Sequence, residues 1–436
     1  MPRAENLVRA TDLSRTAPYW NPEAETMPAE QLHAHQRRGV AEVWDRIWSE
    51  PIPFYADRYA AAGLSAGEVP DLDAVPRTTK DDLRADEAAH PPFGTHRSVG
   101  LDQAVRISKT TGTSGRPVFT LMGPRDLEAA IEMQARTTWT LGLRPGDRFT
   151  HPWPGGLYVS AAFTNFFYTR TGVLEIPVGP PVTAEDAREH VELWQLLRPH
   201  GFMLTMSQLQ IYLDAAASLG TDFTELTAGT TVSLYDLSMN LPGPRSRMEK
   251  YLGCRIRTQS GAGDIPGFGA AECEFGTGVH VPHDYLVVQV VDPATGASLP
   301  EGRMGHLVVT TIGLDANLVR FDLEDLATLE SGPCPCGRTG PRLRVWGRAA
   351  EALVLDGVTV LPVHVQGALD EHGGPEFQVH LEESRQAGRL VLSIESTGTG
   401  TAEEELLAAA LGVPVTVRPI VPGSLPRAAF KPRRTG

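Results

Sequence analysis

Residues 108–117 of the chain read Ser108-Lys109-Thr110-Thr111-Gly112-Thr113-Ser114-Gly115-Arg116-Pro117. Glycine lets the backbone turn its N–H groups toward a ligand, and successive N–H groups form a concave site for anions. The hydroxyl groups add hydrogen-bond donors, and Arg116 adds a planar cation that suits phosphate. We interpret Thr110, Thr111, Gly112, Thr113, Ser114, Gly115 and Arg116 as a phosphate-binding loop. The alternative is a polar surface loop, and the stretch does not have the Gly-x-x-x-x-Gly-Lys-Ser/Thr pattern of a Walker A loop.

The segments around this loop predict an α/β fold. Residues 28–66 have helical periodicity, and a helix is expected over 126–143, where Asp126 suits a helix N-terminus. Strands over 173–178 and 202–206 alternate with helices over 184–197 and 209–219, which indicates βαβ units and a mostly parallel sheet.

From residue 283 the pattern becomes β-rich. It predicts strands over 285–291 and 306–311 with a turn at 292–296. The last ninety or so residues have a strand over 390–395, a helix over 403–411 and a strand over 415–420. We therefore predict a large N-terminal domain over 1–345, with mostly parallel sheets and a β-rich part, and a small α+β domain over 346–436.

Composition narrows the class of protein. The 436 residues include 39 basic and 53 acidic side chains, and the net charge of −14 argues against a nucleic-acid-binding surface. We find no apolar run of the roughly 18 residues that cross a membrane, and the N-terminal residues lack the apolar core of a signal peptide. A cytoplasmic, enzyme-like protein without a membrane partner is the expectation.

Four cysteines in such a chain do not indicate structural disulfides. Cys334 and Cys336 lie in a Gly/Pro-rich loop, and Cys273 precedes His280 by seven positions. Together they form a Cys3His set of the kind that closes a tetrahedral, structural zinc site. The alternative is a buried small residue at Cys273 and an exposed loop at Cys334–Cys336. Cys254 is expected to be a buried thiol.

Several motifs in fixed order resemble the phenylacetate–coenzyme A ligase branch of the adenylate-forming enzymes. Together with the phosphate loop and the Cys3His set, these motifs extend over most of the chain. The Cys3His set is also typical of that branch. These motifs are Tyr19-Trp20-Asn21-Pro22-Glu23, Val75-Pro76-Arg77-Thr78-Thr79-Lys80-Asp81-Asp82-Leu83-Arg84, Arg320-Phe321-Asp322-Leu323-Glu324-Asp325, Gly347-Arg348-Ala349-Ala350-Glu351 and Leu425-Pro426-Arg427-Ala428-Ala429-Phe430-Lys431.

The resemblance implies a reaction in which a carboxylate attacks the α-phosphate of ATP, giving an acyl-adenylate and pyrophosphate, and a thiol, usually coenzyme A, takes the acyl group. It implies that Lys431, on a small mobile domain, is catalytic together with Arg116. It also implies that Asp325 binds the ribose, that Arg348 lies near phosphate or ribose, and that Ser260, Gly261 and Asp264 contact the nucleotide, with Asp264 holding Mg2+. A homodimer is the expected assembly. A solvated basic tail is the alternative for Lys431.

The acyl pocket is expected at His151, Trp153, Gly155, Gly156 and Tyr158, with Tyr235 on a later segment. Aromatic walls suit a flat ring, so an aryl or aryl-alkenyl acid is the expected substrate. His151 could bind a ring substituent or be a satisfied structural histidine.

The chain also departs from the family pattern. Ser260 replaces a tyrosine and Asp264 a glutamate, Arg116 replaces a lysine, Ala350 a hinge aspartate and Phe430 a glycine. These departures keep two alternatives open. The enzyme could pass the adenylate to a carrier-protein thiol or an amine, or activate nitrite for N–N bond formation, in secondary metabolism. The protein could also be a non-catalytic nucleotide-binding relative.

Overall fold

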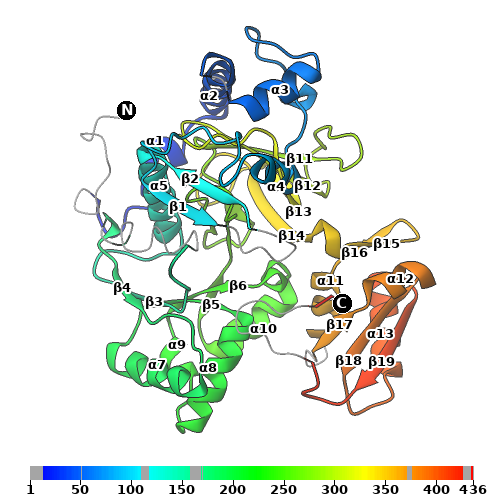
Figure 1. The fold of residues 1–436 in the computed structure, drawn as a ribbon. Helices are drawn as coiled ribbons and strands as arrows, with labels where there is room; N and C mark the ends of the chain where they lie inside the picture. The colour runs from blue at the N-terminus through cyan, green and yellow to red at the C-terminus, as the bar shows by residue number, and fades with distance from the viewer. Residues whose placement is uncertain are drawn as a thin grey trace. The chain divides into compact units, whose positions relative to one another are not determined.

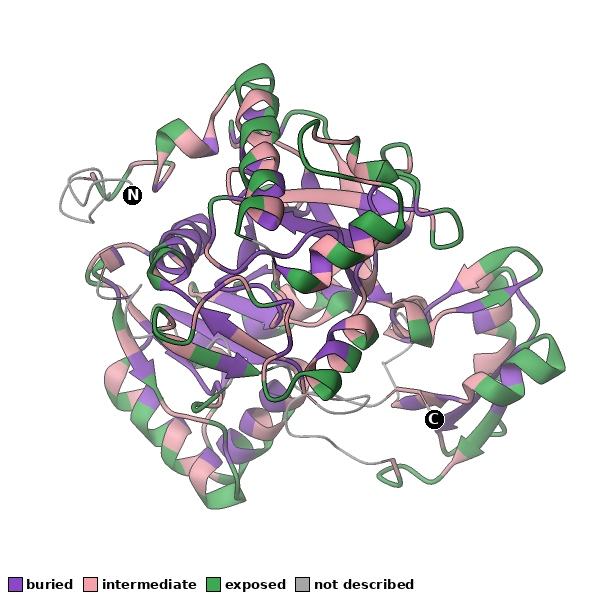
Figure 2. Cartoon of the chain, turned by 45° about the horizontal axis from the view of Figure 1, so that its top comes forward, coloured by how far each residue is buried: buried purple, intermediate pink, exposed green. Residues whose placement is uncertain are grey.

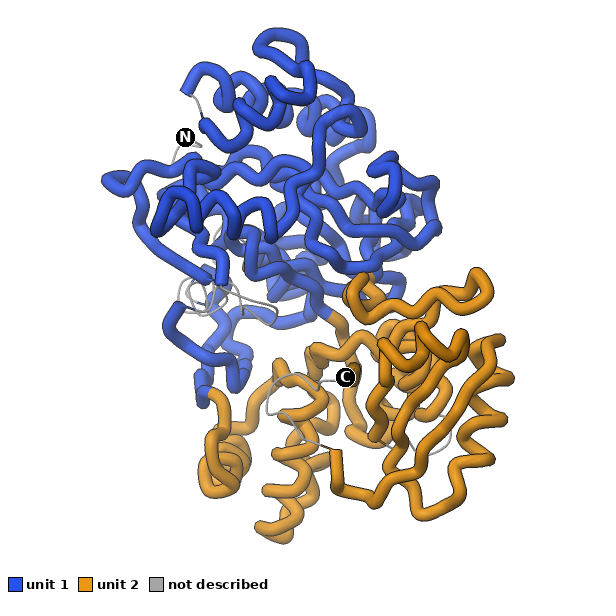
Figure 3. Tube along the Cα trace, turned by 45° about the vertical axis from the view of Figure 1, so that its right-hand side comes forward, with its two compact units in different colours: residues 1–179, 259–344 blue, residues 180–258, 345–436 orange. Residues whose placement is uncertain are grey.

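The computed structural model describes residues 13–50, 52–109, 117–157, 168, 170–370, 376–425 and 434–435. It has the predicted mixture of parallel sheets, antiparallel sheets and covering helices (Figure 1). The chain divides into two compact units, residues 1–179 with 259–344 and residues 180–258 with 345–436 (Figure 3). No helix among the described residues has the length and apolar character that a membrane span requires.

The first unit begins with helices and continues with short strands. Its elements up to residue 179 are α1 (Pro22–Glu25), α2 (Ala29–Ser49), α3 (Pro53–Ala61), η3 (Leu72–Ala74), α4 (Lys80–Ala89), β1 (Arg106–Lys109), β2 (Phe119–Met122), α5 (Pro124–Thr140), β3 (Arg148–His151) and β4 (Leu174–Pro177). β1 pairs antiparallel with β2, and β3 pairs parallel with β4.

The prediction of a single helical stretch over 28–66 is wrong in one respect. The structure divides this stretch into α2 and α3 and leaves residues 62–66 outside a helix. Proline is favoured at the first position of a helix and breaks a helix interior, so Pro53 starts a new helix. Gly63, at φ 79°, then leaves the helical conformation. α2 keeps one buried face, with Val43, Trp44 and Ile47, and one exposed face (Figure 2).

A seven-stranded sheet forms the β-rich part of the first unit, in the order β11-β12-β13-β14-β10-β9-β8. Its strands are β8 (Gln259–Ser260), β9 (Ala270–Glu272), β10 (Val279–His280), β11 (Leu286–Val291), β12 (Gly305–Thr311), β13 (Phe321–Glu330) and β14 (Arg342–Arg348). The strands expected over 285–291 and 306–311 are therefore confirmed. Asp292 closes the predicted turn between them, since its side chain accepts the N–H groups of Ala294 and Thr295.

The second unit starts with βαβ units, as the alternating pattern predicts. Its elements up to residue 258 are α7 (Ala184–Leu197), β5 (Gly201–Thr205), α8 (Met206–Ser218), α9 (Thr224–Thr227), β6 (Thr231–Tyr235), η5 (Leu237–Asn240), α10 (Pro242–Leu252) and β7 (Arg255–Arg257). β5, β6 and β7 are parallel neighbours.

The C-terminal part of the second unit is the small α+β structure expected from the sequence. Its elements are η6 (Ala349–Glu351), β15 (Leu353–Leu355), β16 (Val358–Val360), α11 (Pro362–Asp370), β17 (Phe377–Val379), α12 (Leu381–Ala387), β18 (Leu390–Glu395), α13 (Thr401–Leu411) and β19 (Val415–Ile420). β18 lies between β17, to which it is antiparallel, and β19, to which it is parallel. Phe377, Leu392 and Leu407 are fully or almost fully buried in the core of this part.

The predicted domains, 1–345 and 346–436, rest on the change of composition and pattern along the sequence. The two compact units group segments by their packing, which is a different criterion, so the domain boundary stays a prediction.

Candidate active site and metal site

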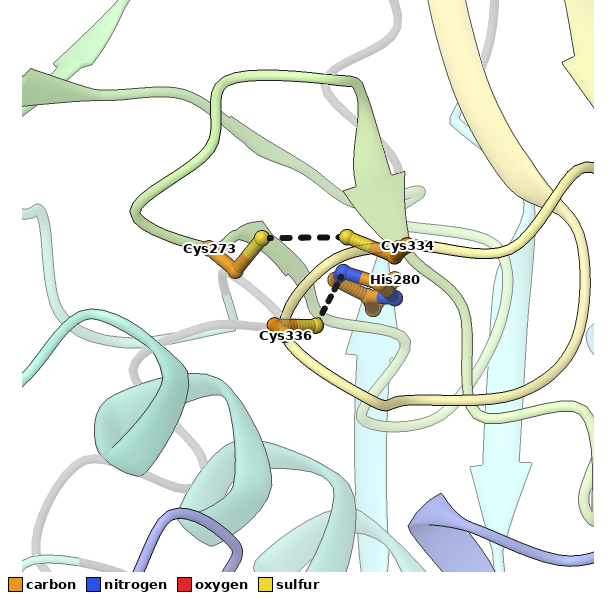
Figure 4. A group of neighbouring side chains, drawn as sticks. All are labelled: Cys273, His280, Cys334 and Cys336. Carbon is orange, nitrogen blue, oxygen red and sulfur yellow. Dashed lines mark hydrogen bonds between the residues drawn. The ribbon is translucent and has the colours of Figure 1, made fainter.

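The Cys3His set is brought together by strands of the seven-stranded sheet and the loop between β13 and β14 (Figure 4). Sγ of Cys273 lies 3.6 Å from Sγ of Cys334, and Sγ of Cys336 lies 3.4 Å from Nε2 of His280. The four candidate ligand atoms all lie within 4.8 Å of one another. A tetrahedral zinc ion with Zn–S bonds of about 2.3 Å would separate two sulfur ligands by roughly 3.8 Å, so the spacing fits this metal.

Strand pairing explains why Cys273 and His280 meet Cys334 and Cys336, although residues 281–333 separate the two pairs in the chain. Cys273 directly follows β9, and β10, which carries His280, lies between β9 and β14. The loop with Cys334 and Cys336 leads into β14. The strand order therefore places the loop beside the ends of β9 and β10.

The loop itself has a conformation that glycine permits. Gly337 has φ 83°, and its N–H donates to the carbonyl of Cys334. A Cβ atom at this position would lie 2.3 Å from the hydroxyl of Tyr19, and that hydroxyl donates to the carbonyl of Cys336. Hydrogen bonds from Cys273 and His280 lower the pKa of the Cys336 thiol, although burial opposes the change. The thiolate is the form that binds metal.

Asp264, the expected Mg2+ ligand, lies in the glycine-rich turn after Ser260 and Gly261. Gly261 is required there, because a Cβ atom would come within 2.6 Å of the carbonyl oxygen of Phe268. The Asp264 side chain is 8% exposed, and its Oδ2 lies 3.0 Å from Nζ of Lys80. Its Oδ1 is buried and has no hydrogen-bond partner in the described part of the chain. An unpartnered carboxylate oxygen is a hard ligand, so this residue fits a magnesium ion.

Asp325, the expected ribose ligand, lies in β13 and is partly exposed. The start of this strand is held by Asp322, which accepts hydrogen bonds from Nη1 of Arg77 at 2.9 Å and from the N–H of Glu324 at 2.9 Å. His306 contributes a third contact, with Nδ1 at 3.0 Å from Oδ2. Burial raises the pKa of Asp322, but its hydrogen bonds and the nearby cations lower the pKa by more. The pKa of this carboxyl group is therefore below its usual value. Arg348 is the last residue of β14, directly before η6.

Among the residues expected to form the acyl pocket, His151 has contacts that the structure defines in detail. His151 is the last residue of β3 and is buried, with Nε2 at 2.8 Å from Oε1 of Glu175. The other ring nitrogen, Nδ1, accepts the N–H of Trp153 at 3.3 Å. Both nitrogens therefore have partners within the chain, which favours the structural alternative over a bond from His151 to a substrate. The sequence could not show this, because Glu175 belongs to the neighbouring strand β4.

Trp153, Gly155 and Gly156 follow β3 directly. Trp153 is 9% exposed, and Gly155 and Gly156 are both exposed, with Gly156 at φ 76°. Tyr235 is the last residue of β6, and the Asp236 carboxylate after it caps η5 by accepting the N–H of Ser238 at 2.9 Å.

Three groups of predicted residues lie outside the described part of the chain. They are the phosphate loop Thr110, Thr111, Gly112, Thr113, Ser114, Gly115 and Arg116, the pocket residue Tyr158, and Lys431. Their flanking residues are described. β1 and β2 pair up to Lys109 and Phe119 on either side of the phosphate loop. After Lys431, the carbonyl of Arg434 accepts the N–H of Val379, and the Arg434 guanidinium lies 4.6 Å from the centre of the Phe377 ring.

Two polar residues beside Asp264 were not singled out from the sequence. Lys80 stands at the first position of α4, where the helix dipole disfavours a cation, and this was the signal that could have drawn attention to it. Asn317 follows β12 in a segment without a recognisable motif, and only its burial without side-chain partners distinguishes it.

Comparison with known proteins agrees with this architecture. A phenylacetate–coenzyme A ligase of Thermus thermophilus is 30% identical over 448 aligned residues, which cover 94% of this chain and 96% of that protein. A phenylacetate–coenzyme A ligase of Escherichia coli K12 is 26% identical over 93% of this chain and 95% of its own. The structure of a 2-hydroxyisobutyryl-CoA ligase in the postadenylation state superposes with a TM-score of 0.86 at 25% identity, over all of this chain and 94% of that one. No protein-family model matches the sequence.

The fold and the sequence together define the class of this protein, an AMP-forming acid ligase of the adenylate-forming superfamily. Within that class the chain belongs to the phenylacetate–coenzyme A ligase family.

Proposed function

We propose that this chain activates an aromatic carboxylic acid with ATP and Mg2+ to an acyl-adenylate and then transfers the acyl group to coenzyme A. The observation that carries the proposal is the similarity to phenylacetate–coenzyme A ligases along almost the whole chain. Family membership supports the adenylation chemistry, and the names of these relatives support an aromatic acid. An aryl or aryl-alkenyl acid is the proposed substrate class.

The proposed reaction needs two anions, the carboxylate and the α-phosphate, to approach each other. Positive groups and N–H donors that face the developing charge lower the barrier to this approach. We assign this role to Thr110–Gly115 and Arg116 in the phosphate loop and to Lys431, which would contact both reacting groups. Mg2+, held by Asp264, would supply charge neutralisation at the phosphates. Asp325 would accept the ribose hydroxyl groups, with Arg348 beside them and with Ser260 and Gly261 along the nucleotide.

We assign the acyl pocket to Trp153, Gly155, Gly156, Tyr158 and Tyr235. His151 supports its wall through Glu175 rather than binding the acid. Cys273, His280, Cys334 and Cys336 would hold a structural zinc ion, since all four ligands come from the protein and leave no open position for chemistry. A cytoplasmic homodimer remains a prediction from the family.

A different acceptor is the second candidate, and Ala350 and Ser260 favour it. The family has an aspartate in place of Ala350, at the hinge that reorients the small domain for the thiol step, and a tyrosine in place of Ser260. Phe430 departs from the glycine before the catalytic lysine. An enzyme with these changes could pass its adenylate to a carrier-protein thiol or an amine, or activate nitrite.

The test is pyrophosphate release from ATP and Mg2+ over a panel of aromatic acids, with and without coenzyme A. Release with one acid and formation of its thioester are expected. Release without thioester would support the second candidate, and carrier proteins, amines and nitrite would then be assayed. A protein that binds ATP but releases no pyrophosphate with any acid or with nitrite would fit the non-catalytic alternative.

A further inference from the structure

A small cavity with a largely apolar wall and a few polar side chains lies beside Asp264 in the first unit. Its wall includes Asp264, Asn317, Arg97 and the β2 residues Phe119 and Thr120. Its volume of about 40 Å³ is enough for a small ion with a few water molecules. Phe119 and Thr120 belong to β2, the first described strand after the proposed phosphate loop in the sequence.

Three side-chain atoms on this wall are buried and have no hydrogen-bond partner among the residues that the structure describes: Oδ1 of Asp264 and both Oδ1 and Nδ2 of Asn317. Asn317 is 4% exposed and Asp264 is 8% exposed. A buried polar group without a partner destabilises a protein, so such groups in a native fold indicate a bound ion, water or ligand. Two of the three atoms are hard oxygens, the donors that Mg2+ prefers.

The fold holds Asn317 in place by its backbone. Its N–H donates to Oγ of Ser98 at 2.7 Å, and its carbonyl accepts the hydroxyl of Tyr55 at 3.4 Å. Neither contact uses the side chain. The amide is therefore set on the cavity wall by a fixed backbone, which is the arrangement of a preorganised ligand.

Lys80 determines the charge of the site. Its ammonium group, 3.0 Å from Oδ2 of Asp264, neutralises that carboxylate, whose Oδ1 has no hydrogen-bond partner among the described residues. Burial lowers the pKa of His96, and its Nδ1 lies 2.8 Å from Oδ2 of the buried Asp86, so that second carboxylate already has a partner. With Asp264 neutralised and Arg97 on the wall, the described residues favour an anion that carries a divalent cation over the free cation.

We propose that Asp264 and Asn317 together supply the protein oxygens of the divalent-cation site, and that Lys80 neutralises Asp264 so that the cation binds only with the nucleotide. The new elements are the Asn317 ligand and the Lys80 control of metal binding. The inference rests on the proposed function, because it needs an ATP–Mg2+ substrate.

The test measures binding of Mn2+ to the full-length protein through loss of the free-ion EPR signal, alone and with α,β-methylene-ATP, which is not cleaved between its first two phosphates. Wild type should bind Mn2+ tightly only with the nucleotide analogue. Asn317→Leu should weaken this binding at least tenfold, in line with the roughly 10–100-fold effect of changes around a metal ligand. Asn317→Asp, which keeps an oxygen, should retain it.

Lys80→Met gives an independent readout with a definite sign. Removal of the ammonium group should tighten the binding of Mn2+ without nucleotide by more than about tenfold. A purely structural lysine would leave this affinity unchanged or weaken it. Thermal unfolding serves as the folding control, and Asn317→Leu should have an unchanged or higher Tm without ligand, because it removes an unpartnered amide from the interior.

The results that would overturn the role of Asn317, the role of Lys80 and the proposed function differ from one another. Equal binding of Mn2+ and nucleotide by wild type and Asn317→Leu would overturn the ligand role of Asn317. Free Mn2+ binding by Lys80→Met that does not exceed wild type would overturn the role of Lys80. Absence of Mn2+ binding by wild type even with the analogue would contradict the proposed function itself.

Discussion

Sγ of Cys336 lies 3.4 Å from Nε2 of His280, although residues 281–335 separate them in the chain. The contact joins a loop to strand β10, and with Cys273 and Cys334 it completes a four-ligand set. A metal at this position would tie three segments of the seven-stranded sheet together.

We expect the purified protein to contain about one zinc ion per chain, which elemental analysis can measure. Removal of the metal with a chelator should lower the Tm, because binding to the folded state alone stabilises that state. Cys336→Ser should lose the metal. Cys254→Ala, at the buried cysteine outside the cluster, is the matched control and should keep it. A metal-free protein with the same Tm as the untreated one would contradict the structural role.

Replacement of Lys431 by alanine should abolish adenylation, by about 100-fold or more, while ATP binding remains measurable by calorimetry. The loss is expected because no other group would neutralise both the carboxylate and the α-phosphate. Arg433→Ala, two residues further along the same basic segment, is the control and should keep most of the activity. If the two variants lost activity equally, Lys431 would be one of several interchangeable cations rather than the catalyst.

Replacement of Asp322 by asparagine should destabilise the protein at neutral pH by about 2–4 kcal/mol, since it leaves Arg77 and His306 without their buried partner. The pKa of this carboxyl group is below its ordinary value of 3.8 in the folded protein. Its stabilising effect is therefore complete above the unfolded pKa and is lost as the pH falls through the folded one. Urea unfolding at a series of pH values should show the gap between wild type and variant closing below about pH 4. A constant gap would show that the carboxylate charge is not the cause.

Substitution of Gly155 by alanine tests the acyl pocket. No atom of the described residues lies within 4 Å of the added Cβ position, and the backbone there does not require glycine. We expect an unchanged Tm and a several-fold higher KM for the acid, with the KM for ATP unaltered, because the methyl group would occupy substrate space. Unchanged kinetics for both substrates would remove Gly155 from the pocket.

Substitution of Gly261 by alanine, unlike that of Gly155, should disturb the fold itself. Its Cβ would come within 2.6 Å of the Phe268 carbonyl, so the turn that carries Asp264 must shift. Both a lower Tm and a higher Mg2+ requirement are expected, measured by thermal unfolding and by the dependence of pyrophosphate release on Mg2+. A variant with wild-type values for both would show that the turn tolerates the displacement.

The sequence alone determined the order and type of several helices and strands, because these depend on local periodicity and end signals. The helix over 184–197 has its predicted bounds in α7, and the strands over 390–395 and 415–420 have theirs in β18 and β19. The class of enzyme also followed from the sequence, since its motifs are contiguous and keep their order. The break between α2 and α3 needed the structure, because helical periodicity on both sides hides a short interruption. Elements such as α4, α10 and β14 were not predicted and also needed it.

Tertiary structure alone decided which distant side chains meet. Glu175 contacts the Nε2 atom of His151, Lys80 pairs with Asp264, and the side chain of Asn317 lines the same small cavity as Asp264. None of these relationships has a sequence signal of its own. The partners belong to different strands, helices and turns, and their distances depend on strand order and packing over the whole first unit, which no local pattern encodes.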